Sequence, residues 1–389
     1  MALEKIPGLY YDETAEYQTA GSGGKIPVFI GVTGNSASTG YAVDGTQINK
    51  FTKWEDVNRS IANGGIGVWA EGTTNILLDV IKDFFEEAEI KSTEDLGIPY
   101  IYVIDVGAGT SKNVWLTALT TAKTKPDAII EGYFGAEAIT DTGYTLPDFI
   151  AAAEASIKAE STNLNIRNGF TTKFGATDAQ LIALNPSSGG ILKSRIGIIE
   201  PLKVGKIFAR ICTTPYYIEP GYLEFRTIRP GTFASRTRVE ELALQNAGII
   251  FGHDEKVNDL TLTRINLSTS TAFAANPRPA DALFHARFNA DNLLRRVFEA
   301  VYPQVKANES STNIITTQTA VDAVIDEEVE AERMIAYDDT TGEGTRLLLV
   351  ESNSQPYDME LSGQIQPINC TGPIVVKAKI KNPKIVATS

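Results

Sequence analysis

The chain has 389 residues, of which 43% are hydrophobic and 21% charged, so it can bury sizeable cores and is too apolar for a disordered protein. Its net charge of −13 disfavours binding to nucleic acid and to anionic membrane surfaces, because both need clustered Lys and Arg. Two cysteines and two histidines are too few for a disulfide framework, and a zinc site would have to borrow carboxylates. We therefore expect no metal and no cofactor.

Residues 1–24 are predicted to form an extended N-terminal arm. Pro7-Gly8 interrupts regular structure, the tyrosines nearby favour strand, and Gly21-Ser22-Gly23-Gly24 is a flexible joint. Gly21, Gly23 and Gly24 are thus the hinge candidates. The start lacks the charged-then-apolar pattern of a signal peptide, and no apolar run is long enough to span a bilayer, so we expect a cytosolic protein without membrane insertion.

From residue 25 to 184, short apolar runs alternate with amphipathic stretches. The runs at 28–32, 99–106 and 128–134 are predicted strands. Helices are predicted to follow Thr74, Ser111 and Thr145, each a good N-cap residue. Because helices between short buried strands act as crossover connections, residues 25–184 are predicted to be the first part of an α/β core with a layered sheet.

Residues 185–278 are rich in Thr, Ser, Gly and Pro and give no clear domain signal, so we interpret them as a candidate outer or inserted region. The second part of the core is predicted at 279–389. A long helix is expected from Ala280 to about Lys306, and another from Thr317, with its acidic run at 326–332 as a solvated face.

Alternation of apolar and polar residues at 357–365 and 376–381, together with 345–351, predicts strands near the end of the chain. The fold class is therefore predicted as α/β: a layered α/β core with a small antiparallel C-terminal sheet and extended N- and C-terminal arms.

The two ends of the chain carry opposite charge. Residues 364–389 contain four lysines and no acidic residue, a charge of +4, which leaves −17 for the rest of the chain, and residues 1–20 carry −3. Opposite charges on facing strands favour pairing, so this contrast suits an arm of one chain docking on the tail sheet of another. An edge strand protected by lysines explains the same pattern equally well.

Motifs for site chemistry are sparse. Gly107-Ala108-Gly109-Thr110-Ser111-Lys112 begins like a GxGxxG turn but ends in Lys, and no GxxxxGK[ST] motif occurs. His253-Asp254-Glu255 are contiguous, which directs their side chains apart, and His285 lies beside phenylalanines in a predicted helix. Ordinary structural roles are favoured, with a nucleotide-binding enzyme that uses the Gly107–Lys112 turn as the alternative.

Several segments, taken in order, resemble the contractile tail sheath proteins of bacteriophages and related injection machines. Ile6-Pro7-Gly8-Leu9-Tyr10-Tyr11-Asp12-Glu13 is similar to the family's PGVY-x-x-E opening, and 28–32 and 51–57 are similar to the strand and helix entry that follow. Residues 292–301 resemble the family's long helix, with Asn308 near its end, and 359–367 and 373–376 resemble its terminal strands.

The resemblance implies a structural subunit, not an enzyme, that stacks as six-fold rings around an inner tail tube and contracts. It implies as partners the neighbouring sheath subunits, the tube protein, and baseplate and tail terminator proteins, with no nucleic acid. The location would be a virion tail, or the host cytoplasm as an assembled contractile particle. Another self-assembling shell protein is the remaining alternative.

In that family the terminal arms link neighbouring subunits by completing a shared sheet. The residues expected to make this linkage are Ile6, Pro7, Gly8, Leu9, Tyr11, Val376, Lys377, Ala378, Lys379, Ile380 and Lys381.

Overall fold

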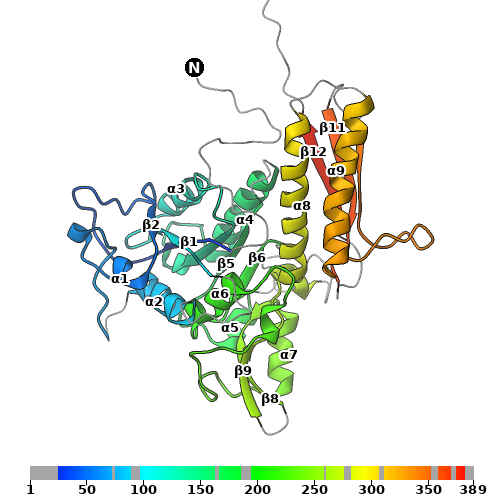
Figure 1. Ribbon diagram of the computed structural model, residues 1–389. Helices are drawn as coiled ribbons and strands as arrows, with labels where there is room; N and C mark the ends of the chain where they lie inside the picture. The colour runs from blue at the N-terminus through cyan, green and yellow to red at the C-terminus, as the bar shows by residue number, and fades with distance from the viewer. Residues whose placement is uncertain are drawn as a thin grey trace, which may run out of the picture.

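The computed structural model describes residues 25–71, 75–88, 97–162, 166–184, 194–257, 260–275, 282–305, 311–351, 358–368 and 374–381. Within these residues, a seven-stranded sheet with helices on both faces lies beside a pair of long helices that pack on a three-stranded sheet (Figure 1). The predicted α/β fold class is confirmed.

The central sheet has the strand order β2-β3-β1-β4-β5-β6-β7 and is parallel except for β2 at one edge. The strands are β1 (Pro27–Gly31), β2 (Asn49–Phe51), β3 (Ile101–Asp105), β4 (Ile130–Phe134), β5 (Asn168–Thr171), β6 (Ile196–Ile199) and β7 (Ile249–Ile250). β1, β3 and β4 are the three strands predicted from apolar runs. All their residues are buried, as expected of parallel strands covered on both faces.

Alternate residues of β1 enter two separate cores. Phe29 points toward α2 (Ile76–Ala88) and α6 (Val204–Thr213), where its ring lies 5.0 Å from that of Phe84 and 5.3 Å from that of Phe208. Val28 and Ile30 belong to the opposite core, under α3 (Lys112–Ala122) and α4 (Leu146–Thr162). The sheet is therefore the middle layer of three.

Within residues 25–184, the three predicted helix starts hold to within a residue where they can be compared. Thr74 lies outside the described residues, and Asn75 next to it caps α2 by accepting the N–H of Leu78 at 3.0 Å. Ser111 precedes α3 without a side-chain cap bond, and Thr145 precedes α4.

The segment 185–278 is divided between the central layer and the periphery. It supplies β6, β7 and the fully buried α6 to the α/β core, which its Thr- and Gly-rich composition did not indicate. Outside that layer lie α7 (Arg238–Asn246) and the hairpin of β8 (Gly252–Val257) and β9 (Leu260–Ile265) (Figure 1). The remaining short helices are α1 (Trp54–Val57), α5 (Asp178–Ile182) and 3-10 turns at Ile61–Asn63, Ala136–Ala138, Pro220–Tyr222 and Thr271–Ala274.

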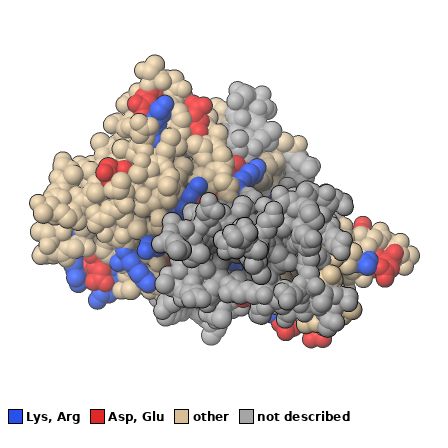
Figure 2. All heavy atoms as spheres, turned by 90° about the horizontal axis from the view of Figure 1, so that it is seen from above, with Lys and Arg blue, Asp and Glu red and all other residues tan. Residues whose placement is uncertain are grey.

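Two long helices, α8 (Phe284–Val305) and α9 (Ser311–Glu330), lie side by side on an antiparallel sheet (Figure 1). Its strands are β10 (Arg346–Glu351), β11 (Asp358–Ile365) and β12 (Ile374–Lys381), as the alternating patterns predicted. The loop between α9 and β10 projects from this unit in both views (Figures 1 and 2).

Two sequence expectations for these helices need correction. α9 begins at Ser311, six residues before the predicted Thr317, because Ile314 adds to the apolar contact with the core. The acidic run is not wholly a solvated face, since the Glu328 side chain is fully buried and pairs with Arg296 and Arg333. Among the described helices, none combines the length and apolar composition needed to cross a membrane.

Candidate assembly interface

The predicted linkage residues Val376–Lys381 all lie in β12, at one edge of the three-stranded sheet. The whole strand pairs antiparallel with β11, from Ile365 opposite Ile374 to Asp358 opposite Lys381. In the part of the chain that the structure describes, no strand pairs with the other side of β12. The inter-subunit role of these residues stays a prediction.

The strand register gives the tail lysines neighbours within their own chain. Lys379 lies opposite Glu360 and Lys381 lies opposite Asp358, whereas Lys377 lies opposite Ser362. Opposite charges at directly facing positions favour an antiparallel pair. By this register, Lys377 is the lysine of β12 without an acidic residue opposite it on β11.

The sheet rests on α8 and α9 through a continuous apolar core. Leu347, Leu361 and Ile365 are fully buried against residues such as Val297 and Val321. At the end of α9, the Glu328 carboxylate accepts hydrogen bonds from the guanidinium groups of Arg296 on α8 and Arg333 beyond α9. β12 is thus the edge of a well-packed unit.

A buried ion pair joins this unit to the central sheet. The Arg195 guanidinium, just before β6, donates to both carboxylate oxygens of Asp291 on α8 at 2.9 and 3.1 Å, and Asn168 on β5 donates to the same carboxylate at 3.0 Å. Burial alone would raise the pKa of Asp291, but Arg195, together with Arg287 and Arg295, holds this pKa below its usual range.

Lys25, the first described residue, is anchored to the end of α6. Its backbone N–H donates to the Cys212 carbonyl, and its ammonium donates to the carbonyls of Ile211 and Thr214. Complete burial lowers the pKa of Lys25 to about 7, against the smaller opposing effects of Cys212 and Glu219. The predicted arm residues Ile6, Pro7, Gly8, Leu9 and Tyr11 and the hinge residues Gly21, Gly23 and Gly24 lie outside the described residues.

The Gly107–Lys112 turn is organised around carboxylates. The buried Asp105 accepts hydrogen bonds from the Gly107 N–H at 2.7 Å and from the hydroxyls of Thr33 and Tyr41, both at 2.7 Å. The Lys112 N–H donates to Asp141. Because a bound phosphate would have to compete with these carboxylates, the geometry favours the ordinary structural turn over the nucleotide-binding alternative.

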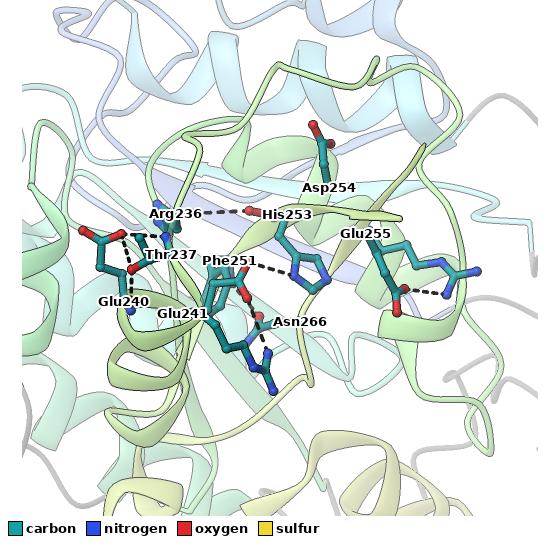
Figure 3. Close-up of polar contacts among 12 residues, drawn as sticks. Arg236, Thr237, Glu240, Glu241, Phe251, His253, Asp254, Glu255 and Asn266 are labelled. Atoms are coloured by element: carbon teal, nitrogen blue, oxygen red, sulfur yellow. Dashed lines mark hydrogen bonds and ion pairs between the residues drawn. The ribbon is translucent and has the colours of Figure 1, made fainter. Parts of the chain in front are cut away.

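The side chains of His253, Asp254 and Glu255 diverge in the hairpin, as Figure 3 shows. His253 Nδ1 lies 3.5 Å from Glu241, Asp254 accepts the Thr263 hydroxyl at 2.8 Å, and Glu255 pairs with Arg264 at 2.9 Å. These contacts support structural roles for all three residues.

His285 and Cys212 are each buried. His285 Nδ1 lies 2.6 Å from the buried Glu219 carboxylate, and burial raises the pKa of the Cys212 thiol. Cys370 lies outside the described residues. No group of three potential metal ligands occurs in the ranges that the structure describes.

No protein-family model matches the sequence, and no curated protein is significantly similar to it. Solved structures do match. The sheath tail protein from Listeria innocua has a TM-score of 0.60 and 8% identity, over 95% of this chain and 97% of that one. The contracted helical sheath of the anti-feeding prophage has a TM-score of 0.57 and 11% identity, over 100% and 99%.

The contracted sheath of an extracellular contractile injection system, PVC, has a TM-score of 0.54 and 10% identity, over 99% of this chain and 96% of that one. The sequence resemblance is thereby confirmed at the level of the fold: this chain has the fold of contractile tail sheath proteins along nearly its whole length.

Proposed function

We propose that this chain is a structural subunit of a contractile sheath, which stacks as rings around an inner tail tube and drives that tube through a target envelope. The observation that carries the proposal is the fold likeness to sheath proteins over 95–100% of the chain, two of them from contracted sheaths. Its partners would be neighbouring copies, the tube protein and the proteins at the two ends of the tail, in an assembled contractile particle.

Linkage between subunits would use strand addition. The N-terminal arm of one subunit, with Ile6, Pro7, Gly8, Leu9 and Tyr11, would pair with the outer edge of β12 in a neighbour. Main-chain hydrogen bonds give such a contact adhesion that tolerates sequence change, and an edge strand offers an unused row of them. The support for this choice of edge is that β12 pairs with β11 on one side only among the described strands.

Movement would be confined to the arm joint at Gly21, Gly23 and Gly24. The support is the anchoring of Lys25 to α6 and of α8 to the central sheet, which hold the described unit together while the joint absorbs changes of angle. The energy for contraction would come from a larger packed interface in the contracted form, without nucleotide hydrolysis.

Electron microscopy of the purified full-length chain tests the proposal. We expect helical tubes from the full chain, and a folded but unassembled protein after deletion of residues 1–20, with circular dichroism as the control for folding. Flat sheets or closed shells would indicate another self-assembling protein, and tight nucleotide binding by a monomer would indicate the enzyme alternative. Normal tubes from the truncated chain would rule out arm linkage while leaving the sheath role intact.

A further inference from the structure

The edge of the three-stranded sheet opposite β12 is β10, and a side chain of α9 is bound to it. The amide oxygen of Gln318 accepts the N–H of Leu349 at 2.8 Å, and its amide nitrogen donates to the carbonyl of Leu347 at 3.0 Å. In a strand, the backbone groups of alternate residues face opposite edges. The Gln318 amide therefore binds both backbone groups next to Leu348, the Leu347 carbonyl and the Leu349 N–H, on the edge of β10 that faces away from β11.

The amide is held in one orientation. Its nitrogen also donates to the carboxylate of Asp322, one helical turn further along α9, at 2.8 Å. Because a carboxylate only accepts hydrogen bonds, Asp322 fixes the nitrogen on the side of the Leu347 carbonyl and the oxygen on the side of the Leu349 N–H. The arrangement is thus specific to an amide side chain at position 318.

β10 would be a strong self-pairing strand if this edge were open. Its sequence has four consecutive apolar residues, Leu347-Leu348-Leu349-Val350, and no proline. Leu348 and Val350 are each 40% exposed, while Leu347 is buried beneath the helices. In an antiparallel pair of two β10 strands centred on Leu348, each Leu349 N–H would donate to the Leu347 carbonyl of the other copy. These are the two groups that Gln318 occupies.

We propose that Gln318 is a specificity-determining residue for self-assembly, which closes the β10 edge so that a second copy of this chain adds a strand only at β12. The choice of β12 as the productive edge rests on the proposed function. The closure of β10 against a second β10 strand does not, because it follows from the Gln318 contacts alone.

A cysteine reporter tests the closure. In two β10 strands paired about Leu348, the facing residues form the closely spaced, non-hydrogen-bonded type of pair, with Cα atoms about 4.5 Å apart, which suits a disulfide. We would place Leu348→Cys in the full chain, together with Cys370→Ser, and add Gln318→Met, which keeps the length of the side chain and removes its hydrogen bonds. The matched control is Thr319→Met, because the Thr319 hydroxyl donates to the Ile315 carbonyl of its own helix.

Under mild oxidation, we expect the Gln318→Met protein to form at least about fivefold more dimer, linked by a disulfide at position 348, than the Gln318 and Thr319→Met proteins. Equal dimer yields in all three would overturn the proposal. If Gln318→Met fails to fold, Gln318→Glu replaces it, since a carboxylate loses the bond to the Leu347 carbonyl and is repelled by Asp322; an unchanged dimer yield would then also overturn it.

The result of the dimer experiment does not depend on whether the sheath role is correct, because dimers are measured in dilute protein before any tube forms. Absence of tubes from the unmodified chain would refute the sheath role and leave the β10 result standing.

Discussion

At the scale of single residues, the most unusual group is Lys25, a lysine without solvent contact. Its ammonium lies between the carbonyls that end α6 and the rings of Phe288, at 4.8 Å, and Tyr216, at 5.1 Å. Those carbonyls and rings favour a cation, but loss of hydration disfavours it more strongly, and the pKa falls from 10.5 to about 7. Lys25 therefore anchors the chain to the end of α6 through a side chain whose charged form is disfavoured by burial.

The pH dependence of stability follows from this pKa. Between pH 7 and 10.5 the unfolded chain holds a proton at Lys25 that the folded chain has released, so the Lys25 contribution to the free energy of unfolding rises with pH. We expect the free energy of unfolding of the wild type, minus that of Lys25→Met, to increase between pH 7 and 9. The increase should be at most about 1.4 kcal/mol per pH unit. Urea unfolding at several pH values measures it, and a difference independent of pH would contradict the lowered pKa.

The sequence could not predict which charged residues are buried. Arg195 and Asp291 are far apart in the chain, and nothing in their local patterns distinguishes them from solvated residues. Glu328 stands in an acidic run whose other members look the same, yet it alone of Glu327, Glu328 and Glu330 faces Arg296 from a buried position. Such pairs depend on which elements meet in space, whereas the apolar strands β1, β3 and β4 carry their burial pattern locally.

At the scale of elements, α6 packs closely against α2. Gly205 in α6 lies so near α2 that an added Cβ would be 2.2 Å from the Val80 carbonyl oxygen and 2.8 Å from the Asp83 Cβ. Because the two helices come so close, every residue of α6 is buried. α6 nevertheless belongs to residues 185–278, which the sequence suggested as an outer region. The sequence marks Gly205 only as a weak helix former, because the partner helix is more than a hundred residues away.

We expect Gly205→Ala to lower the free energy of unfolding by about 1–3 kcal/mol, because the added methyl group forces the two backbones apart. Helix propensity alone would predict a gain of about 1 kcal/mol from the same change. The two effects have opposite signs, so the midpoint of urea unfolding separates them. Thr319→Ala, at an exposed position of α9, is the control that raises propensity without a clash, and stabilisation in both variants would show that α2 and α6 can separate without cost.

At the scale of the whole molecule, the contrast between an acidic chain and a basic tail looked from the sequence like a match between two ends. The register changes this interpretation, because two tail lysines lie opposite Glu360 and Asp358 of β11. The strand proposed to dock the arm of a neighbouring subunit therefore also faces acidic residues of its own chain. The order of weak motifs along the chain predicted the sheath fold, but the register could not be predicted, since a slip of one residue preserves the motifs and changes every facing pair.

The register also separates the two roles of the tail lysines experimentally. Lys377→Glu places the new charge opposite Ser362 and leaves the β11–β12 pair without repulsion, whereas Lys379→Glu places it opposite Glu360. We expect Lys377→Glu to keep the urea midpoint of the subunit but to raise, several-fold, the protein concentration needed for tubes at about 50 mM salt, because residues 1–20 are acidic. The increase in this threshold concentration should be smaller at about 500 mM salt, where exposed charges are screened.

Lys379→Glu should lower the urea midpoint as well, and Lys377→Gln is the control that removes charge without reversing it. If sedimentation finds one threshold for the wild type and Lys377→Glu at low salt, the lysine at 377 protects an edge strand and takes no part in docking the arm.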